Sequence, residues 1–174
     1  YIKKVLPWMV LGILIGVFIG KELPERQFKI GMVALIFISV IVIIYWDRRK
    51  SKNVPKHWTF AGGTGILAGI STMIGNLAGA FTNLFFLAMR LPKNEFVGTA
   101  AWLFLMTNAF KLPFHLFVWH TISVETLSLN LRLLPMVLLG LFIGVKLVKK
   151  ISEANYRRFI IAVTVIGAVA ILFR

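Results

Sequence analysis

The chain has 174 residues, of which 59% are hydrophobic, and it carries 20 Lys and Arg against 6 Asp and Glu, a formal net charge of +14. This apolar content exceeds the roughly 45 to 50% of soluble domains and indicates an integral membrane protein. The lack of cysteine excludes disulfides, thiolate metal sites and cysteine nucleophiles. Because the basic residues gather between apolar runs, the charge indicates membrane topology rather than nucleic-acid binding.

The first apolar segment is repeated near the end of the chain. Residues 6–17, LPWMVLGILIGV, align without gaps on residues 134–145, LPMVLLGLFIGV, at an offset of 128. Each copy is followed by charged residues at matching positions and then by another apolar run. The chain therefore contains parts of two copies of one structural unit.

The repeat divides the chain into three parts. We interpret residues 1–46 as the last two transmembrane helices of a first repeat, 47–57 as a basic cytoplasmic linker, and 58–174 as a second repeat. On this interpretation the first-repeat counterpart of 58–133 would lie ahead of Tyr1 and is missing from the chain. A half-transporter that dimerises is the alternative.

Residues 60–89 are apolar but rich in glycine and small polar residues, among them Ser71, Thr72 and Thr82. The segment is too long for one straight crossing, and Gly75-Asn76 divides it into pieces of about 14 residues, ~21 Å each at the helical rise, too short for two crossings. We therefore predict a re-entrant helical hairpin. Broken backbone is tolerated in a membrane only where protein or a water-filled cavity covers it, so the break predicts a cavity.

The break also predicts an anion site. The second half-helix begins between Gly75 and Gly79, and its first N–H groups, free of intrahelical partners, can bind an anion while Asn76 adds a side-chain donor. The alternative is that the glycines of this segment only allow helices to pack closely.

A helix is expected over 95–111, with Asn94 as its N-cap and Glu95 in its first turn. Thr99 lies about one turn inside this helix. Its hydroxyl could face the same cavity, or it could bond back to the preceding turn.

Asn108 and Lys111 are spaced i to i+3 near the end of this helix, so we expect them to share a face. The lysine could neutralise an anionic substrate. The alternative is that Lys111, which precedes Leu112-Pro113 where helices tend to stop, only snorkels or interacts with the helix C-terminus.

Two further helices are expected over 133–146 and 156–174. With a re-entrant hairpin, each full unit makes three net crossings, an odd number, which inverts the two copies relative to each other. Inverted repeats with binding sites at broken helices are typical of secondary transporters.

Three sequence blocks carry a family resemblance. GISTMIGNLAG at 69–79, PKNEFVGTAAW at 92–102 and NAFKLP at 108–113 together resemble the second half of the sulfite exporter TauE/SafE family, and residues 1–46 resemble the end of its first half. The resemblance implies a multi-pass permease of the bacterial inner membrane for sulfite, sulfoacetate or related sulfonates.

We therefore expect an all-α polytopic membrane protein, an inverted-repeat transporter that exports or exchanges small anions by alternating access. The predicted substrate-binding residues are Gly75, Asn76, Gly79, Thr99, Asn108 and Lys111. We expect no cofactor, metal or nucleic acid, and the lack of HExxH, Walker and GxSxG motifs argues against an enzyme. Homo-oligomerisation and coupling to protons or sodium ions stay open. The alternatives are a channel for another small solute and a membrane scaffold or subunit that transports nothing.

Overall fold

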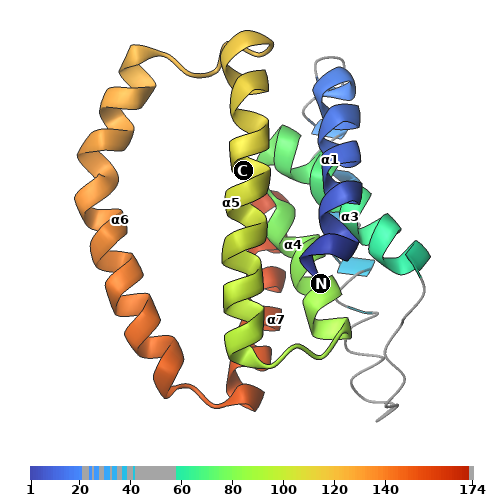
Figure 1. The fold of residues 1–174 in the computed structure, drawn as a ribbon, viewed down its shortest axis with the longest axis vertical. Helices are drawn as coiled ribbons and strands as arrows, with labels where there is room; N and C mark the ends of the chain where they lie inside the picture. Colours follow the sequence, from blue (N-terminus) through green and yellow to red (C-terminus); the bar gives the residue numbers. More distant parts are fainter. Residues whose placement is uncertain are drawn as a thin grey trace.

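The computed structural model describes residues 1–20 and 58–172, together with the short pieces 24, 26–27, 30–31, 33–34, 37–38 and 41. The elements of the two long stretches are all helices: α1 (Ile2–Ile19), α3 (Trp58–Gly75), α4 (Ala78–Ala88), α5 (Lys93–Phe117), α6 (Val124–Lys150) and α7 (Glu153–Leu172) (Figure 1). Among the described helices, α1 and α6 are long and apolar enough to cross a membrane. Most of residues 21–46, where the second of the two helices expected within 1–46 would lie, and all of the linker 47–57 lie outside the described residues.

Glycines bring α1 and α3 into close contact. A Cβ atom added to Gly12 would meet the backbone carbonyl of Ile66, and one added to Gly69 would lie 2.8 Å from the Cα of Gly12. One added to Gly16 would lie 2.9 Å from the Cβ of Met73. Small residues at helix interfaces let two backbones approach each other in this way. At these positions the glycines therefore allow the two helices to pack closely. This is the alternative role that the sequence analysis gave for the glycines of residues 60–89.

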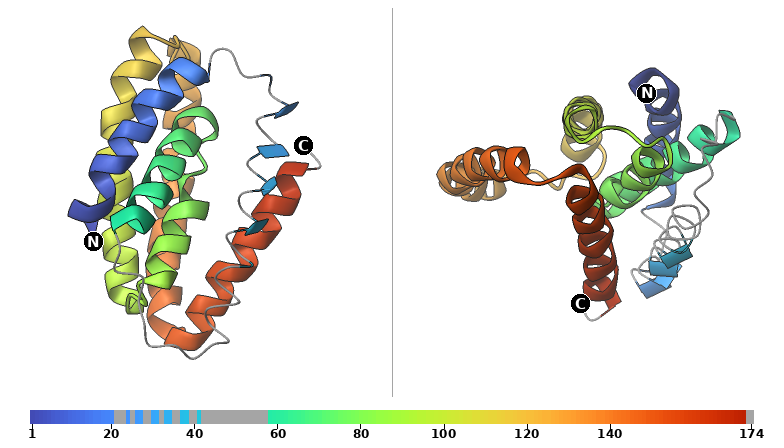
Figure 2. Two further views of the ribbon diagram at one scale, coloured as in Figure 1. Left: turned by 90° about the vertical axis from the view of Figure 1, so that its right-hand side faces the viewer. Right: turned by 90° about the horizontal axis from the view of Figure 1, so that it is seen from below.

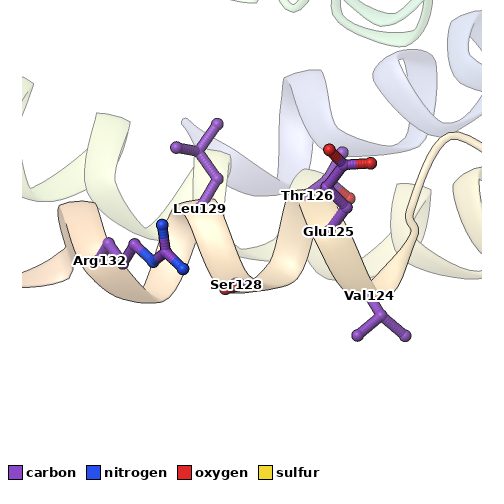
Figure 3. A pocket seen from close by; sticks show the side chains of 6 residues that line it. All are labelled: Val124, Glu125, Thr126, Ser128, Leu129 and Arg132. Atoms are coloured by element: carbon purple, nitrogen blue, oxygen red, sulfur yellow. The ribbon is translucent and has the colours of Figure 1, made fainter.

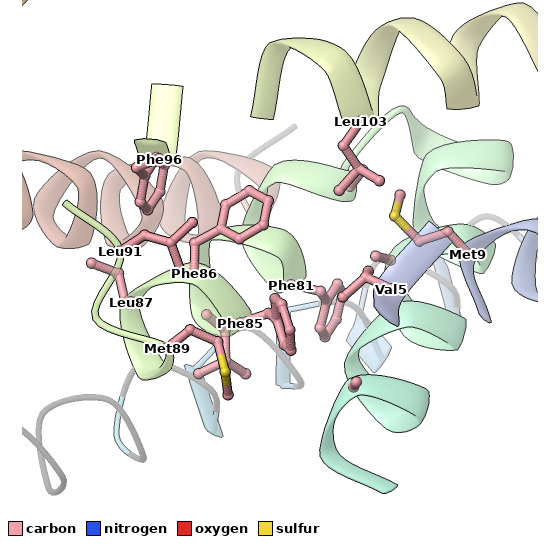
Figure 4. Packing of buried hydrophobic residues seen from close by; sticks show 14 of the residues in the cluster. Val5, Met9, Phe81, Phe85, Phe86, Leu87, Met89, Leu91, Phe96 and Leu103 are labelled. Atoms are coloured by element: carbon pink, nitrogen blue, oxygen red, sulfur yellow. The ribbon is translucent and has the colours of Figure 1, made fainter. Parts of the chain in front are cut away.

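The short helix α4 lies at the centre of the apolar core. Phe81, Phe85 and Phe86 of α4 are almost fully buried (Figure 4). The Phe86 ring lies 5.2 Å from the ring of Phe96 in α5, which in turn lies 5.5 Å from the ring of Tyr156 in α7. A helix that is apolar on all sides is expected to be enclosed by other elements. The second half of the broken segment is thus covered by protein.

The start of α5 corrects the prediction that Asn94 caps this helix. Helix α5 begins at Lys93, one residue before Asn94, and its N-cap residue is Pro92. The backbone N–H of Lys93 donates to both carboxylate oxygens of Glu153, at 3.1 and 2.9 Å. The residue that caps α5 therefore comes from the first turn of α7, 60 residues further along the chain, and it ties the two helices together.

Helices α5 and α6 are both longer than predicted. The expected stop at Leu112-Pro113 does not occur, and α5 continues to Phe117 with Pro113 inside it; a proline removes only one backbone hydrogen bond, here to the carbonyl four residues earlier. Helix α6 begins at Val124 instead of 133, because Ser123 and Thr126 form a capping box. The other described residues bury no side chain of α6.

The two copies of the repeated segment run in opposite directions (Figures 1 and 2). The C-terminal end of α1 lies beside the loop that follows α5, where the indole N–H of Trp119 donates to the carbonyl of Val17 at 3.3 Å. Helix α6 starts at this end and finishes at the other, where the ammonium group of Lys93 donates to the carbonyl of Ile151 at 2.6 Å. Helices α1 and α6 are therefore antiparallel, because α1 ends at the side of the molecule where α6 begins.

Candidate functional site

Helix α3 ends at Gly75 and α4 begins at Ala78, so the helix breaks where the sequence indicated. Asn76 adopts a left-handed conformation with φ of 55°, which Asn tolerates better than most residues. Its N–H donates to the carbonyl of Thr72 at 3.2 Å, and the N–H of Leu77 donates to the carbonyl of Ser71 at 3.1 Å. These bonds satisfy two carbonyls at the end of α3 and turn the chain sharply into α4.

Lys111 of α5 reaches this break. The side chain is buried, with 5% of its surface exposed. Its ammonium group donates to the carbonyl of Thr72 at 3.0 Å, to the hydroxyl of Thr72 at 3.0 Å and to the amide oxygen of Asn76 at 2.9 Å. Since an ammonium group has three protons, each has one acceptor.

The charge of Lys111 lies at the C-terminal end of α3. The sequence left open an interaction of this lysine with a helix C-terminus, and the structure shows one, but with α3 rather than with α5. The negative end of the α3 dipole favours a cation there. No carboxylate of the described residues is among the hydrogen-bond partners of Lys111, so the positive charge is buried among uncharged oxygens.

The break is accessible next to this buried charge. Gly75 and Asn76 are exposed and Gly79 is half-buried. No described atom would lie within 4 Å of a Cβ added to Gly79. Leu77, the residue before α4, offers no side-chain acceptor to the first N–H groups of that helix. A half-helix N-terminus and a buried ammonium group thus flank the same break, whose backbone is exposed at Gly75 and Asn76.

Two predicted site residues do not join Lys111. Asn108 is exposed, whereas Thr107 and Lys111 are buried, so the i to i+4 neighbour and not the i to i+3 neighbour shares the inner face of α5. Thr99 is half-buried but lies 12 residues before Lys111, ~18 Å away along the helix. Asn108 is therefore not among the hydrogen-bond partners of Lys111, its place in the site stays a prediction, and Thr99 lies apart from the break.

Thr72 is the residue that the sequence prediction omitted. It supplies two of the three acceptors of Lys111, and it is spaced i to i+4 from Asn76, a spacing that was visible in the sequence. Other buried hydroxyls of the core do not point to a ligand. Those of Ser71, Thr82 and Thr107 donate to carbonyls four residues earlier in their own helices.

A surface hollow of about 720 Å³ lies elsewhere, on α6 (Figure 3). All six of its lining residues belong to the first turns of this helix: Val124, Glu125, Thr126, Ser128, Leu129 and Arg132. None of them belongs to the break or contacts Lys111 among the described hydrogen bonds. The hollow is therefore separate from the candidate site.

Comparison with known proteins gives one match. A family model described as Sulfite exporter TauE/SafE matches residues 2–171. Neither a curated protein nor a solved structure matches the chain.

Proposed function

The chain belongs to the sulfite exporter TauE/SafE family, and from this premise we propose that it exports or exchanges small sulfur-containing or organic anions, such as sulfite, sulfoacetate or related sulfonates. Members of the family are membrane transporters and not enzymes. In our proposal the substrate binds at the break between α3 and α4, where Lys111 supplies the positive charge.

The observation that carries this proposal is the burial of Lys111 without a described acidic partner. A buried charge surrounded by neutral groups is costly, and an anion next to it would offset that cost. Since Asn76 is exposed and holds only one of the three ammonium protons, its amide oxygen is the partner that an incoming anion would replace. Thr72 would keep the ammonium group in place.

The break supplies donors of a second kind. The first N–H groups of α4 follow Leu77 directly and lie at the positive end of that helix. A sulfite or sulfonate group has three oxygens and can accept from the lysine and from backbone N–H groups together, which a spherical anion does less well. Gly79, and Gly75 on the other side of the break, leave the backbone accessible. This geometry favours small oxyanions as the substrate class.

The arrangement of helices supports transport by alternating access. The two copies of the repeated segment run antiparallel, as they would in an inverted-repeat transporter of the inner membrane. In our proposal α3 and α4 form a re-entrant hairpin of the second repeat, 58–174, while 1–46 belongs to the first repeat and 47–57 links the two on the cytoplasmic side. The hairpin would then bring the substrate to the middle of the membrane.

The proposal is tested by anion binding to the purified protein. Lys111→Met removes the charge and keeps an unbranched apolar side chain, and Lys146→Met is the matched control because Lys146 is exposed on α6. Titration calorimetry with sulfite, sulfoacetate, sulfate and chloride should give a saturable signal with a sulfur oxyanion, weakened at least about tenfold in Lys111→Met, since one charge-assisted hydrogen bond is worth about 1.5 to 3 kcal/mol. Equal affinity in the two variants would remove Lys111 from the site.

A further inference from the structure

The turn that follows α5 contacts the end of α1 through the side chain of Trp119. The indole N–H donates to the carbonyl of Val17 at 3.3 Å. A Cβ atom added to Gly20 would lie 2.8 Å from two carbon atoms of the indole, so the ring lies there because position 20 has no side chain. This contact joins α1, which we assign to the first repeat, to a turn of the second repeat.

The turn is bonded back onto the last turns of α5, which holds the indole in position. The backbone N–H of Trp119 donates to the carbonyl of Phe114 at 2.9 Å, and that of Thr121 donates to the carbonyl of His115 at 3.0 Å. The hydroxyl of Thr121 lies 2.8 Å from Nδ1 of His115, whose ring packs edge-on against Trp119 with the centroids 5.5 Å apart. The indole is therefore presented to α1 by a turn with its own internal support.

The indole belongs to a small apolar cluster next to the candidate site. This latch cluster joins residues of α1, α3 and α5 to the turn, and its members are Ile13, Val17, Met73, Phe110, Phe114 and Trp119. Lys111 bonds to Thr72, the residue before Met73, and Phe114 follows Lys111 by three residues on α5. The cluster therefore covers the lysine from the end of the molecule at which α1 ends.

We propose that Trp119 is a latch that closes the path between Lys111 and this end of the molecule, and that its ring leaves α1 when an anion passes. The inference rests on the proposed function, because a latch serves only a site that a solute enters and leaves. In alternating access each end of the site is closed by contacts between the repeats that break and re-form in every cycle. One neutral hydrogen bond and one ring contact are weak enough for this, whereas the backbone contacts between α1 and α3 are not.

The latch is tested by the accessibility of a thiol in membrane vesicles. The chain has no cysteine, so Met73→Cys places a single thiol inside the latch cluster, and Ile122→Cys, in the exposed turn, shows from which side of the membrane this end is reached. The probe is a methanethiosulfonate that carries a sulfonate group and does not cross the membrane, added from that side. Met73→Cys should react slowly, because position 73 is buried, and Trp119→Ala in the same protein should raise the rate at least about tenfold.

Two further variants separate the latch from a general loosening of the fold. Trp102→Ala is the matched control, because Trp102 is 59% exposed on α5, and it should leave the rate at Met73→Cys unchanged. Trp119→Phe keeps an aromatic ring but removes the N–H donor, so it should raise the rate about threefold even if Trp119→Ala does not fold.

Equal rates with Trp119 and with Phe at position 119 would overturn the latch, as would a Met73→Cys thiol that reacts as fast as Ile122→Cys while Trp119 is present. The rates are measured without substrate. Absence of anion binding in the calorimetric titration would therefore refute the proposed function without altering them.

Discussion

Along most of its length α3 presents glycines to α1, whereas at its last turn it presents Thr72, and just beyond it Asn76, to a lysine of α5. The first contact is between backbones, and neither side can move without separating two helices. The second is made by a long side chain that holds three separate acceptors, one of them on an exposed residue. The glycines of residues 60–89 thus pack two helices together in α3 and leave the backbone uncovered at the break, so the two interpretations of the sequence apply to different parts of this segment.

The largest effect is expected where the scaffold is tightest. Gly69→Leu would place its Cβ against the carbonyl of Met9 and 2.8 Å from the Cα of Gly12, so only a separation of α1 from α3 could relieve the clash. We expect a loss of about 3 kcal/mol or more, at the upper end for overpacked interiors. Size-exclusion chromatography and thermal unfolding in detergent measure it.

The control for this substitution lies on the same helix. Gly63 is exposed, and no described atom lies within 4 Å of a Cβ added there. Gly63→Leu should therefore fold as the wild type does, or better, since leucine is about 0.8 kcal/mol more favourable in a helix than glycine. Equal destabilisation by both substitutions would contradict the packing role assigned to Gly69.

The next largest effect is expected at Asn76, which follows the C-terminal end of α3, and it concerns anion affinity. Asn76→Asp keeps the shape of the side chain but places a carboxylate 2.9 Å from the ammonium group of Lys111. The resulting ion pair would compete with a bound anion, so we expect anion affinity to fall at least tenfold, or by about 1.4 kcal/mol. Calorimetric titration with sulfite or sulfoacetate measures the change. Unaltered affinity in a folded Asn76→Asp protein would mean that the substrate does not approach Asn76.

The sequence predicted the break and its lysine for physical reasons. Gly75-Asn76 interrupts an apolar segment that is too long for one crossing, and Lys111 is a charge at the end of an apolar run, so both features depend on local composition. Whether Thr107 or Asn108 is buried beside Lys111 could not be predicted in the same way. Both lie one turn before Lys111, and only the position of neighbouring helices decides which one is buried.

The helix ends were predicted less well where the cap is distant. Asn94 is a reasonable N-cap by residue type, but the carboxylate of Glu153 satisfies the first N–H of α5 from another helix. No pattern near residue 93 indicates that partner. The start of α6 was missed for a different reason, because residues 124–132 alternate apolar with polar side chains and the prediction followed the apolar run alone. There the capping pair of Ser123 and Thr126 was a local signal that could have been used.

A smaller effect separates the backbone of Asn76 from its side chain. The residue has a positive φ, so Asn76→Ala should lower stability by about 1 kcal/mol, since Ala is strained in the left-handed region. Asn76→Gly removes the same amide but relieves the strain, so it should cost only a few tenths of a kcal/mol. The difference between the two unfolding temperatures reports the strain of the left-handed backbone, less the extra conformational entropy that glycine loses on folding. Similar unfolding temperatures for the Ala and Gly variants would contradict the left-handed conformation of residue 76.

The smallest expected effect is the most informative about Lys111. If this lysine were retained to hold α3 and α5 together, Lys111→Met would destabilise the protein by several kcal/mol, as does removal of one partner from a buried ion pair. Its partners are neutral, however, and two of the three acceptors do not depend on it: the Thr72 carbonyl also accepts from the N–H of Asn76, and the Asn76 residue is exposed. We therefore expect the free energy of unfolding to change by less than about 1 kcal/mol in the absence of anion, because the desolvation cost of the ammonium group is removed together with its hydrogen bonds.

Thermal unfolding of Lys111→Met without ligand measures this change in the free energy of unfolding. A fall of 3 kcal/mol or more would identify Lys111 as part of the scaffold, like Gly69, whereas a stable protein without anion affinity would mean that the charge is kept for the substrate.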